Sequence, residues 1–315
     1  MSELEHAVVP TDLHGVRLDA AAAQLFPAYS RARLKTWIEA GALSVNGAPA
    51  EKVRQLVAEG DALSLIAEAE PHPGNVSAQD IPLDVVYADD EVAVLNKPPG
   101  LTVHPGAGQS DGTLQNALLH RFPQTELLPR AGLVHRLDKD TSGLLIVALS
   151  LPAHTALVGA MARREIRREY DALVNGQITA GGTVDQPIGR DPHNRLRMAV
   201  VSDGRHAVTH YRVEARFQVH TLLRVRLETG RTHQIRVHMS EIGHPIVGDA
   251  LYGGRMTRGR GLADALRQAL NSFPRQALHA RRLQFLHPVD GRELAFEVEP
   301  PPDMQELLRF LHTYS

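Results

Sequence analysis

The sequence predicts an α+β protein with a small N-terminal module and a larger domain built on a mixed, mostly antiparallel sheet flanked by helices. Three observations lead to this fold class. Two helical segments are followed by a hairpin and a strand within residues 16–70. A stretch rich in breaking residues then separates this module from the rest. Beyond it, strands that can pair as hairpins outnumber the crossover helices that a parallel sheet would require.

The N-terminal module has four recognisable elements. Apolar residues at helical spacing predict a helix over residues 17–26, and a second helix is expected over residues 31–39. Residues 42–47 are typical of a strand that enters an Asn-Gly hairpin turn, and residues 62–66 are expected to form a further strand.

The domain boundaries follow from breaking residues and lost periodicity. Residues 68–80 contain Pro71, Pro73 and Gly74 and show no repeat of apolar side chains, which is typical of a linker. We therefore expect an N-terminal tail over residues 1–15, a first domain over 16–76 and a second domain over 77–315.

The second domain is expected to alternate strands irregularly with a few helices. The predicted strands cover residues 83–87, 92–96, 144–149, 170–175, 208–215, 221–228, 234–238 and 295–298. The predicted helices cover residues 113–121, 152–164 and 263–270.

Composition excludes several classes of site. The 315 residues contain no Cys, so disulfides, thiolate nucleophiles and Cys-ligated zinc or iron–sulfur centres are excluded. No segment has the length and apolar character of a membrane span, and the N-terminus lacks the pattern of a secretory signal. A cytoplasmic protein without a membrane partner is expected, and a monomer is the default expectation.

The net charge of −2 conceals a segregation of charge along the chain. Residues 1–80 hold 6 basic and 11 acidic side chains, whereas residues 121–240 hold 18 and 11. Only four of the 34 basic side chains are Lys. Arg side chains are suited to binding phosphates and to stacking on bases, so the excess of Arg favours an RNA-binding role. A GC-biased codon supply would produce the same excess without any function.

The densest cluster of ionisable side chains is the segment 135–143, which runs directly into the apolar segment 144–148. Reactive side chains are often carried on a loop beside a rigid, buried element. A calcium loop beginning at Asp138 is excluded because its twelfth position is Leu149, which cannot supply a carboxylate. An aspartyl-phosphate phosphatase has its apolar strand before its carboxylates, whereas here the apolar segment follows them. A protein-kinase catalytic loop has Asp directly after His-Arg, whereas here Leu137 intervenes.

Residues 135–144, His-Arg-Leu-Asp-Lys-Asp-Thr-Ser-Gly-Leu, resemble the signature of the RluA family of pseudouridine synthases. The resemblance extends over residues 83–310, with further motifs in the family's order. These are a lysine-proline-glycine loop, a tyrosine motif, an arginine motif and two C-terminal motifs, at residues 96–105, 168–174, 227–238, 248–253 and 275–280. His135, the first residue of the signature, is expected to bind substrate.

The resemblance implies isomerisation of uridine to pseudouridine in structured RNA. The expected substrate is a stem-loop of the large-subunit ribosomal RNA or its precursor particle. The reaction cuts an N–C glycosidic bond, turns the uracil and rejoins it through carbon. It therefore calls for neither a metal nor an organic cofactor.

The family's motifs also imply roles for particular residues. Asp138 would be the essential carboxylate, acting on the ribose either as nucleophile or as base. Arg236 would pair with it as a bidentate fork and keep it charged in a dry site. Tyr170 would stack on the base, Leu278 would form an apolar wall, and Arg136 would fill the gap left by the flipped nucleotide.

The N-terminal module resembles the S4 RNA-binding domain over residues 15–76. By this resemblance its second helix presents Arg31, Arg33 and Lys35 to RNA phosphates. Without the resemblance the same cations would be a solvated helix face. Because the module is acidic overall, its own affinity for RNA is expected to be modest.

Two further groups of residues have competing interpretations. His233 and His238 lie five apart in an expected strand and so on opposite faces, which argues against a shared metal. A run of four arginines before Tyr170 is either a solvated helix end or a contact for RNA phosphates, and its position favours phosphate contact. The run comprises Arg163, Arg164, Arg167 and Arg168.

The main rival to an enzyme is a non-catalytic RNA-binding or ribosome-assembly factor. The joint presence of Asp138, Tyr170 and Arg236 argues against it, because a binding protein needs no such set. A phosphate-ester hydrolase is a more distant alternative.

Overall fold

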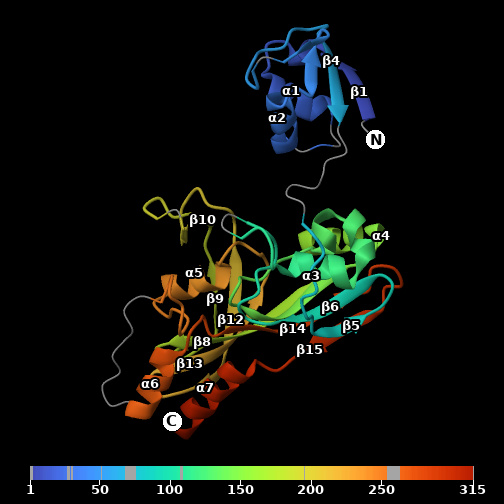
Figure 1. Cartoon of the computed structure of the whole chain (residues 1–315). Coiled ribbons are helices and arrows are strands. Elements are labelled where there is room, and N and C mark those ends of the chain that lie inside the picture. The colour runs from blue at the N-terminus through green and yellow to red at the C-terminus, as the bar shows by residue number, and fades with distance from the viewer. Residues whose placement is uncertain are drawn as a thin grey trace. The chain divides into compact units, whose positions relative to one another are not determined.

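The computed structural model describes residues 3–26, 29, 31–50, 52–67, 76–106, 109–194, 196–253 and 263–314. The chain divides into two compact units, residues 1–75 and 76–315 (Figure 1). Within the described residues, no helix is both long and apolar enough to cross a membrane.

The small unit is a four-stranded antiparallel sheet with two helices packed on it. The sheet has the order β1-β4-β2-β3, and the short strands β2 and β3 are joined through Asn46 and Gly47. Both turn residues have positive φ, 52° and 82°, as the predicted Asn-Gly hairpin requires. The elements are β1 (Glu3–Val8), α1 (Leu18–Leu25), α2 (Arg31–Glu39), β2 (Leu43–Val45), β3 (Ala48–Pro49) and β4 (Ala62–Ala67).

The expected tail over residues 1–15 is wrong in its first part. Residues Glu3–Val8 form β1, which pairs with β4 along its whole length, and Thr11–Leu13 form the short 3₁₀ helix η1. This edge strand has the half-buried Glu5 and Ala7 on its inner side and the exposed Val8 on its outer side, so it lacks a clear hydrophobic pattern and pairing with β4 decides its structure.

The large unit is built on a nine-stranded mixed sheet. Eight strands follow the order β5-β6-β7-β14-β8-β13-β12-β9, and β15 pairs with β14. The strands are β5 (Val85–Ala88), β6 (Val92–Lys97), β7 (Ser142–Ala148), β8 (Arg167–Asn175), β9 (Gly182–Asp185), β12 (Val208–Arg216), β13 (His220–Leu227), β14 (Leu278–Leu286) and β15 (Glu293–Glu297). The short strands β10 (Ile188–Arg190) and β11 (Met198–Val200) form a separate hairpin.

The strand β14 lies in the middle of this sheet, although the sequence did not predict it. It pairs with β7 in parallel and with β8 antiparallel. Its central residues Arg281 and Arg282 interrupt the apolar pattern that indicates a buried strand. Because every other pairing of β7 and β8 is antiparallel, the sheet is mixed but mostly antiparallel, which confirms the predicted α+β class.

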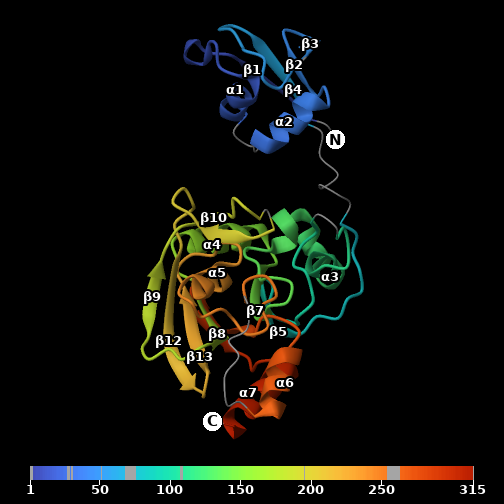
Figure 2. The ribbon, with the colours of Figure 1, turned by 90° about the vertical axis from the view of Figure 1, so that its left-hand side faces the viewer.

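Helices cover both faces of the sheet. Alternate residues of β7 contribute to two different core clusters, since Leu145 and Val147 join one while Leu144 and Ile146 join the other. The first cluster also holds side chains of α3, α5, α6 and α7, and the second holds side chains of α4. The helices are α3 (Leu114–Arg121), α4 (Leu151–Ala162), α5 (Gln234–Glu241), α6 (Asp264–Ser272) and α7 (Pro302–Thr313), with α6 and α7 side by side (Figure 2).

The expected strand over residues 234–238 is wrong, because this segment opens the helix α5. Six consecutive residues of α5, Gln234–Met239, are buried. Gln234, Arg236 and His238 are buried together with apolar side chains, so polar and apolar residues are not separated onto two faces as they are in an amphipathic helix. The alternation of Ile235 and Val237 was therefore mistaken for a strand pattern.

Candidate active site

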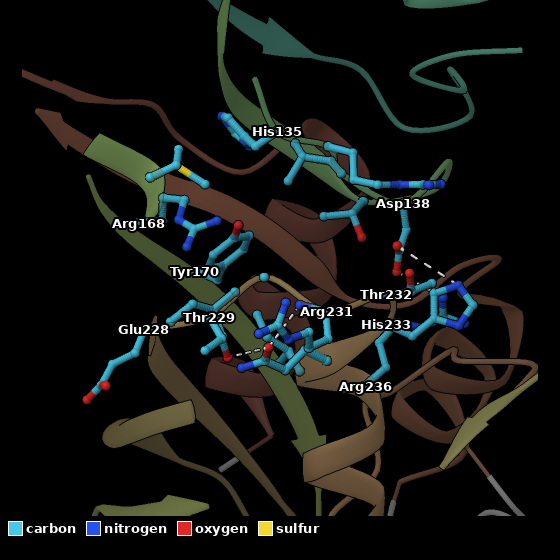
Figure 3. Close-up of a pocket in the computed structure, with 18 of the residues that line it drawn as sticks. His135, Asp138, Arg168, Tyr170, Glu228, Thr229, Arg231, Thr232, His233 and Arg236 are labelled. Carbon is cyan, nitrogen blue, oxygen red and sulfur yellow. Dashed lines mark hydrogen bonds and ion pairs between the residues drawn. The ribbon is translucent and has the colours of Figure 1, made fainter. Parts of the chain in front are cut away.

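The residues singled out in the sequence line one cavity of about 410 Å³ in the large unit. Its walls come from the loop before β7, the end of α4, the strand β8, the segment that leads into α5, and the start of β14 (Figure 3). The predicted residues His135, Arg136, Asp138, Tyr170, Arg236 and Leu278 all line it. These residues are up to 143 positions apart in the chain, so only the sheet order brings them together.

Asp138 is the carboxylate at this cavity, and its contact with Arg236 is present. Its Oδ2 accepts a hydrogen bond of 3.0 Å from Nη1 of Arg236, and its side chain keeps 18% of its surface exposed. Nε2 of His233 lies 4.0 Å from Oδ1 (Figure 3). The carboxylate therefore has a cation beside it and an open side toward the cavity.

Arg236 does not direct its bidentate fork at Asp138, which corrects the predicted geometry. Its Nε and Nη2 donate to the two oxygens of Asp249 at 2.7 and 2.9 Å, which leaves Nη1 for Asp138. Burial disfavours the charged form of Arg236, but the hydrogen bonds and charges of Asp249 and Asp138 outweigh it and raise its pKa. One guanidinium therefore holds two carboxylates, and the stronger geometry goes to the buried one.

Asp249 is the functional residue that the sequence reasoning missed. Its side chain is fully buried, and its Oδ1 also accepts the backbone N–H groups of Leu251 and Tyr252 at 3.0 Å. The preceding residue, Gly248, has φ of 74°, and a Cβ there would lie 2.0 Å from the carbonyl oxygen of Arg275. The motif that contains Gly248 and Asp249 was the available signal, but a motif alone did not say that the carboxylate faces an arginine.

Tyr170 and Leu278 form the apolar part of the cavity. Each side chain lies on a central strand, β8 or β14, and each residue is 4% exposed. Burial raises the pKa of Tyr170, while the positive charge of Arg168 acts in the opposite direction. The phenol is therefore uncharged near neutral pH and offers a ring face and a hydroxyl to whatever enters.

His135 and Arg136 differ in their surroundings although they are neighbours in the chain. Nε2 of His135 accepts the backbone N–H of Ile146 at 3.1 Å, and burial lowers the pKa of His135 to about 3. Its ring is therefore neutral and is bound to the strand β7. Arg136 is exposed at the cavity, and within the described part of the chain it forms no hydrogen bond or ion pair.

Two basic side chains hold the loop that carries Asp138. Nζ of Lys97, which is 1% exposed, donates to the carbonyl oxygens of Pro98, Leu101 and Lys139 at 2.8 to 2.9 Å. Burial lowers the pKa of Lys97 to about 7, against the charges of Asp140 and Asp138.

The second supporting side chain is Arg275, which approaches the loop from the C-terminal part of the chain. Its Nη1 donates to the carbonyl oxygen of Asp140 at 3.1 Å, and its Nε and Nη2 form a fork on Asp303. The position of Asp138 therefore depends on contacts with β6 and α7 as well as on its own loop.

His233 lies at the start of α5, between Asp138 and Tyr252. Its backbone is left-handed, with φ of 57°, and its Nδ1 lies 2.8 Å from the hydroxyl of Tyr252. That hydroxyl accepts the backbone N–H of Met198 at 2.8 Å, so its own hydrogen is available to Nδ1 of His233. Burial lowers the pKa of His233, which leaves a neutral ring with its Nε2–H toward Asp138.

The comparison of His233 with His238 also changes, since His233 caps the start of the helix α5 and His238 lies in its last turn, rather than both lying in a strand. His238 is fully buried and contacts the hydroxyl of Thr209 and the carbonyl oxygen of Gln186, at 2.9 and 3.0 Å. The two rings therefore serve different contacts. Among the described residues, no three or more His, Asp or Glu side chains form a group that could hold a metal ion.

The predicted cations of the small unit lie on α2, as expected, but two of them are engaged locally. Arg31 forms an ion pair of 2.9 Å with the buried Asp19, and Lys35 lies 3.7 Å from Glu39 one turn further along. The side chain of Arg33 lies outside the described residues. All three belong to the small unit, whereas the cavity belongs to the large one.

The arginine run before Tyr170 divides into paired and unpaired members. Arg163 forms an ion pair with Glu165 at 2.8 Å, and Arg164 forms one with Glu228 at 2.5 Å. Arg168 is buried and lines the cavity.

These contacts limit the chemistry that the cavity can perform. A carboxylate held by one arginine can act on an electrophilic carbon as nucleophile or on a C–H bond as base. The ring of Tyr170 beside the side chain of Leu278 can hold a planar, uncharged ring system. The cavity therefore places a carboxylate beside an apolar wall that can hold a planar ring.

The chain is similar to known proteins over both of its units. The RNA pseudouridylate synthase family matches residues 91–241, and the S4 domain family matches residues 16–63. The ribosomal large subunit pseudouridine synthase D of Escherichia coli strain K12 is 51% identical over 305 residues, covering 97% of this chain and 93% of that protein. The protein of the same name from Vibrio parahaemolyticus is 53% identical over 290 residues, covering 92% and 89%.

Solved structures show the same likeness for the large unit. Human RNA pseudouridylate synthase domain containing 4 superposes with a TM-score of 0.57 at 26% identity, covering 73% of this chain and 93% of that one. Human RNA pseudouridylate synthase domain containing 1 gives a TM-score of 0.54 at 29% identity, covering 75% and 89%.

Proposed function

The chain belongs to the RNA pseudouridine synthase family, and from this premise we propose that its substrate is a structured segment of the large-subunit ribosomal RNA. The reaction is an isomerisation, in which the N1–C1′ bond of uridine breaks and a C5–C1′ bond forms. The proton on C5 is lost and a proton is gained at N1, so no atom is gained or lost overall. The names of the curated relatives support the choice of RNA.

Asp138 is the residue that acts on the ribose in this proposal. The observation that carries it is the 3.0 Å contact with Arg236 in a cavity that also holds Tyr170 and Leu278. A carboxylate that must stay ionised while water is excluded needs a fixed cation, because desolvation alone favours its protonated form. Arg236, itself fixed by Asp249, is that cation.

The remaining cavity residues receive the base and replace it in the RNA. The uracil lies on the ring of Tyr170 and against Leu278, since an extruded base must regain the stacking that it loses. Arg136, exposed and free of described partners, enters the space that the flipped nucleotide leaves. His135 contributes a neutral wall of the cavity and holds the loop to β7.

The helix α2 binds RNA phosphates in this proposal, through Arg31, Arg33 and Lys35. Its match to the S4 domain supports the role. The local ion pairs of Arg31 and Lys35 reduce the charge that they present, so the contribution to affinity is small. A small contribution agrees with the acidic composition of this unit.

The test is the substitution Asp138→Asn, which keeps the shape of the side chain and removes its charge. Ribosomal RNA is prepared from a strain deleted for this protein and complemented with the wild-type chain, Asp138→Asn or Asp203→Asn. Asp203 is exposed on a turn away from the cavity, so it is a matched control for the same chemical change. Pseudouridines are mapped as reverse-transcriptase stops after carbodiimide treatment.

We expect the wild-type chain and Asp203→Asn to restore one or more stops in the large-subunit RNA, and Asp138→Asn to restore none. Normal stops with Asp138→Asn would contradict the role of Asp138. Restored stops that lie only in other RNAs would contradict the choice of large-subunit RNA and leave the role of Asp138 standing.

A further inference from the structure

One buried cation of the large unit has neither a counter-ion nor a hydrogen-bond partner among the described residues. Among the described residues, four Lys or Arg side chains are buried, namely Lys97, Arg168, Arg236 and Arg275. Lys97 donates to three carbonyl oxygens, and Arg236 and Arg275 each form a fork on a carboxylate. Arg168 is 7% exposed, forms no hydrogen bond or ion pair within the described chain, and its buried Nε has no partner. Burial of an unpaired charge is costly, so an anion from outside the described chain would stabilise this guanidinium.

Arg168 points into the active-site cavity. It lies on β8 two residues before Tyr170, so the two side chains leave the same face of the strand, and both line the cavity (Figure 3). Residues two apart on a strand are separated by roughly 7 Å. A ligand that contacts Tyr170 with one part therefore reaches Arg168 with another.

The backbone opposite Arg168 is suited to an anion. A Cβ on Gly230 would lie 3.1 Å from Nη1 of Arg168, so the guanidinium rests against the segment that leads into α5. The first turn of a helix leaves N–H groups without partners inside the helix and carries partial positive charge. Ile235 and Arg236, in the first turn of α5, also line the cavity. Arg168, Gly230 and the first turn of α5 therefore line one cavity.

The surroundings of Arg168 are positive as well. Arg231 lines the same side of the cavity, and its pKa is lowered by burial and by the charges of Arg205 and Arg164. The nearby Glu228 is already paired with Arg164 and with His210. Asp138 is bound by Arg236 at another wall of the cavity. No described carboxylate is therefore left to neutralise Arg168.

We propose that Arg168, together with Gly230 and the start of α5, binds the RNA backbone phosphate on one side of the target uridine. The proposal deepens and rests on the proposed function. An arginine fork and free N–H groups match the oxygens of a phosphate, whereas a uracil offers only neutral carbonyl oxygens. The phosphate would fix the sugar in front of Asp138 while the base lies on Tyr170.

The experiment uses a stem-loop that carries a uridine found in the mapping above. In two versions of this RNA, one of the two phosphates flanking the uridine is replaced by an uncharged methylphosphonate. Single-turnover rates and kcat/KM are measured with the full wild-type chain, Arg168→Gln, Arg168→Lys and Arg212→Gln. Arg212 is exposed, paired with Glu214 and not among the residues that line the cavity, so it controls for the loss of one positive charge.

With the wild-type chain, one of the two uncharged linkages should lower kcat/KM about 10- to 100-fold, as expected for a lost charged hydrogen bond. Arg168→Gln should lose a similar factor on the natural RNA and nothing further on that uncharged linkage. Arg168→Lys should recover part of the loss, because it keeps the charge but not the fork. Arg212→Gln should keep the wild-type sensitivity.

Two outcomes would overturn the proposal. One is a wild-type chain that is insensitive to both uncharged linkages, which needs no variant to be folded. The other is an Arg168 variant, folded by its thermal unfolding curve, that still loses the full factor on the uncharged linkage. If the mapped uridine lies in another RNA, the stem-loop is taken from that RNA, so failure of the substrate proposal and failure of this one remain distinct.

Discussion

At the scale of single residues, the site depends on how the donors of Arg236 are divided. Five N–H donors in a planar group can serve two carboxylates at once, and here the fork is on Asp249 while one remaining donor reaches Asp138. Asp249 therefore fixes the plane of the guanidinium, and that plane determines where the cation meets Asp138. The sequence motif predicted that Arg236 contacts Asp138, but it did not predict that the fork of Arg236 binds Asp249.

The substitution Asp249→Asn tests the division. It leaves the charge of Arg236 buried with only Asp138 to oppose it, so the free energy of unfolding should fall by about 3 kcal/mol. The single-turnover rate should fall roughly 100-fold, because the guanidinium loses its fixed orientation. Urea unfolding and single-turnover kinetics on the mapped stem-loop measure the two effects.

Asp264→Asn is the matched control, because the Asp264 side chain is 99% exposed in the first turn of α6. It should change neither quantity. A folded Asp249→Asn chain with an unchanged rate would show that Asp138 and Arg236 keep their geometry without Asp249.

At the scale of elements, the site depends on how closely β7 approaches β14. Gly143 has φ of 109°, and a Cβ there would lie 2.3 Å from the carbonyl oxygen of Ala280. Ser142 and His279 add a side-chain contact of 3.0 Å beside it. This approach ties the end of the Asp138 loop to the strand that carries Leu278, so the two sides of the cavity keep a constant separation.

Gly143→Ala should therefore destabilise the large unit on the order of 3 kcal/mol or more, because both the left-handed backbone and the contact with Ala280 become strained. Activity should fall with it, since Asp138 and Leu278 move apart. Urea unfolding and the single-turnover rate are the measurements.

Gly243 provides the control, since its φ is 81° but nothing lies within 4 Å of a Cβ placed there. Gly243→Ala should cost only about 1 kcal/mol, the conformational part of the penalty. Equal losses for the two alanine variants would mean that the approach of β7 to β14 adds nothing.

The elements were predicted unevenly, for identifiable reasons. Segments with one buried and one exposed face, such as α1, α3 and β13, show the periodicity that predicts them. The helix α5, buried on every side, and the strand β14, which carries paired arginines, do not. Both of these elements contribute residues to the cavity.

At the scale of the whole molecule, neutral buried histidines make the large unit sensitive to acid. Burial lowers the pKa of His104, His220 and His279 to about 4 and that of His135 to about 3. In the unfolded chain each has a pKa near 6.5. Below about pH 6.5 the unfolded state therefore binds protons that the folded state does not, and stability falls as the pH falls.

Above pH 6.5, these four histidines should not change the free energy of unfolding of the large unit. It should then decline by roughly 5 kcal/mol per pH unit toward pH 4, four groups at about 1.4 kcal/mol each. Urea titrations of the full chain at pH 7, 6 and 5 measure this. His220→Leu should reduce the slope by about 1.4 kcal/mol per pH unit, and an unaltered slope in that variant would exclude His220 as a contributor.

The sequence by itself determined the class of the fold, the family and the membership of the cavity. A motif is a short run of neighbouring residues, so it can be recognised from the sequence alone. Such motifs contain Asp138, Tyr170, Arg236 and Leu278. Hydrophobic periodicity is also local, so it was sufficient for the elements with one exposed face.

Only the tertiary structure decided which group each charged side chain faces. Asp249 takes the fork of Arg236, and Lys97 and Arg275 hold the loop of Asp138, while Arg168 stays unpaired at the cavity. These relations join residues from strands that are distant in sequence and adjacent in the sheet. Pairing and desolvation depend on distances in space, and those distances exist only after β7, β8 and β14 have packed together.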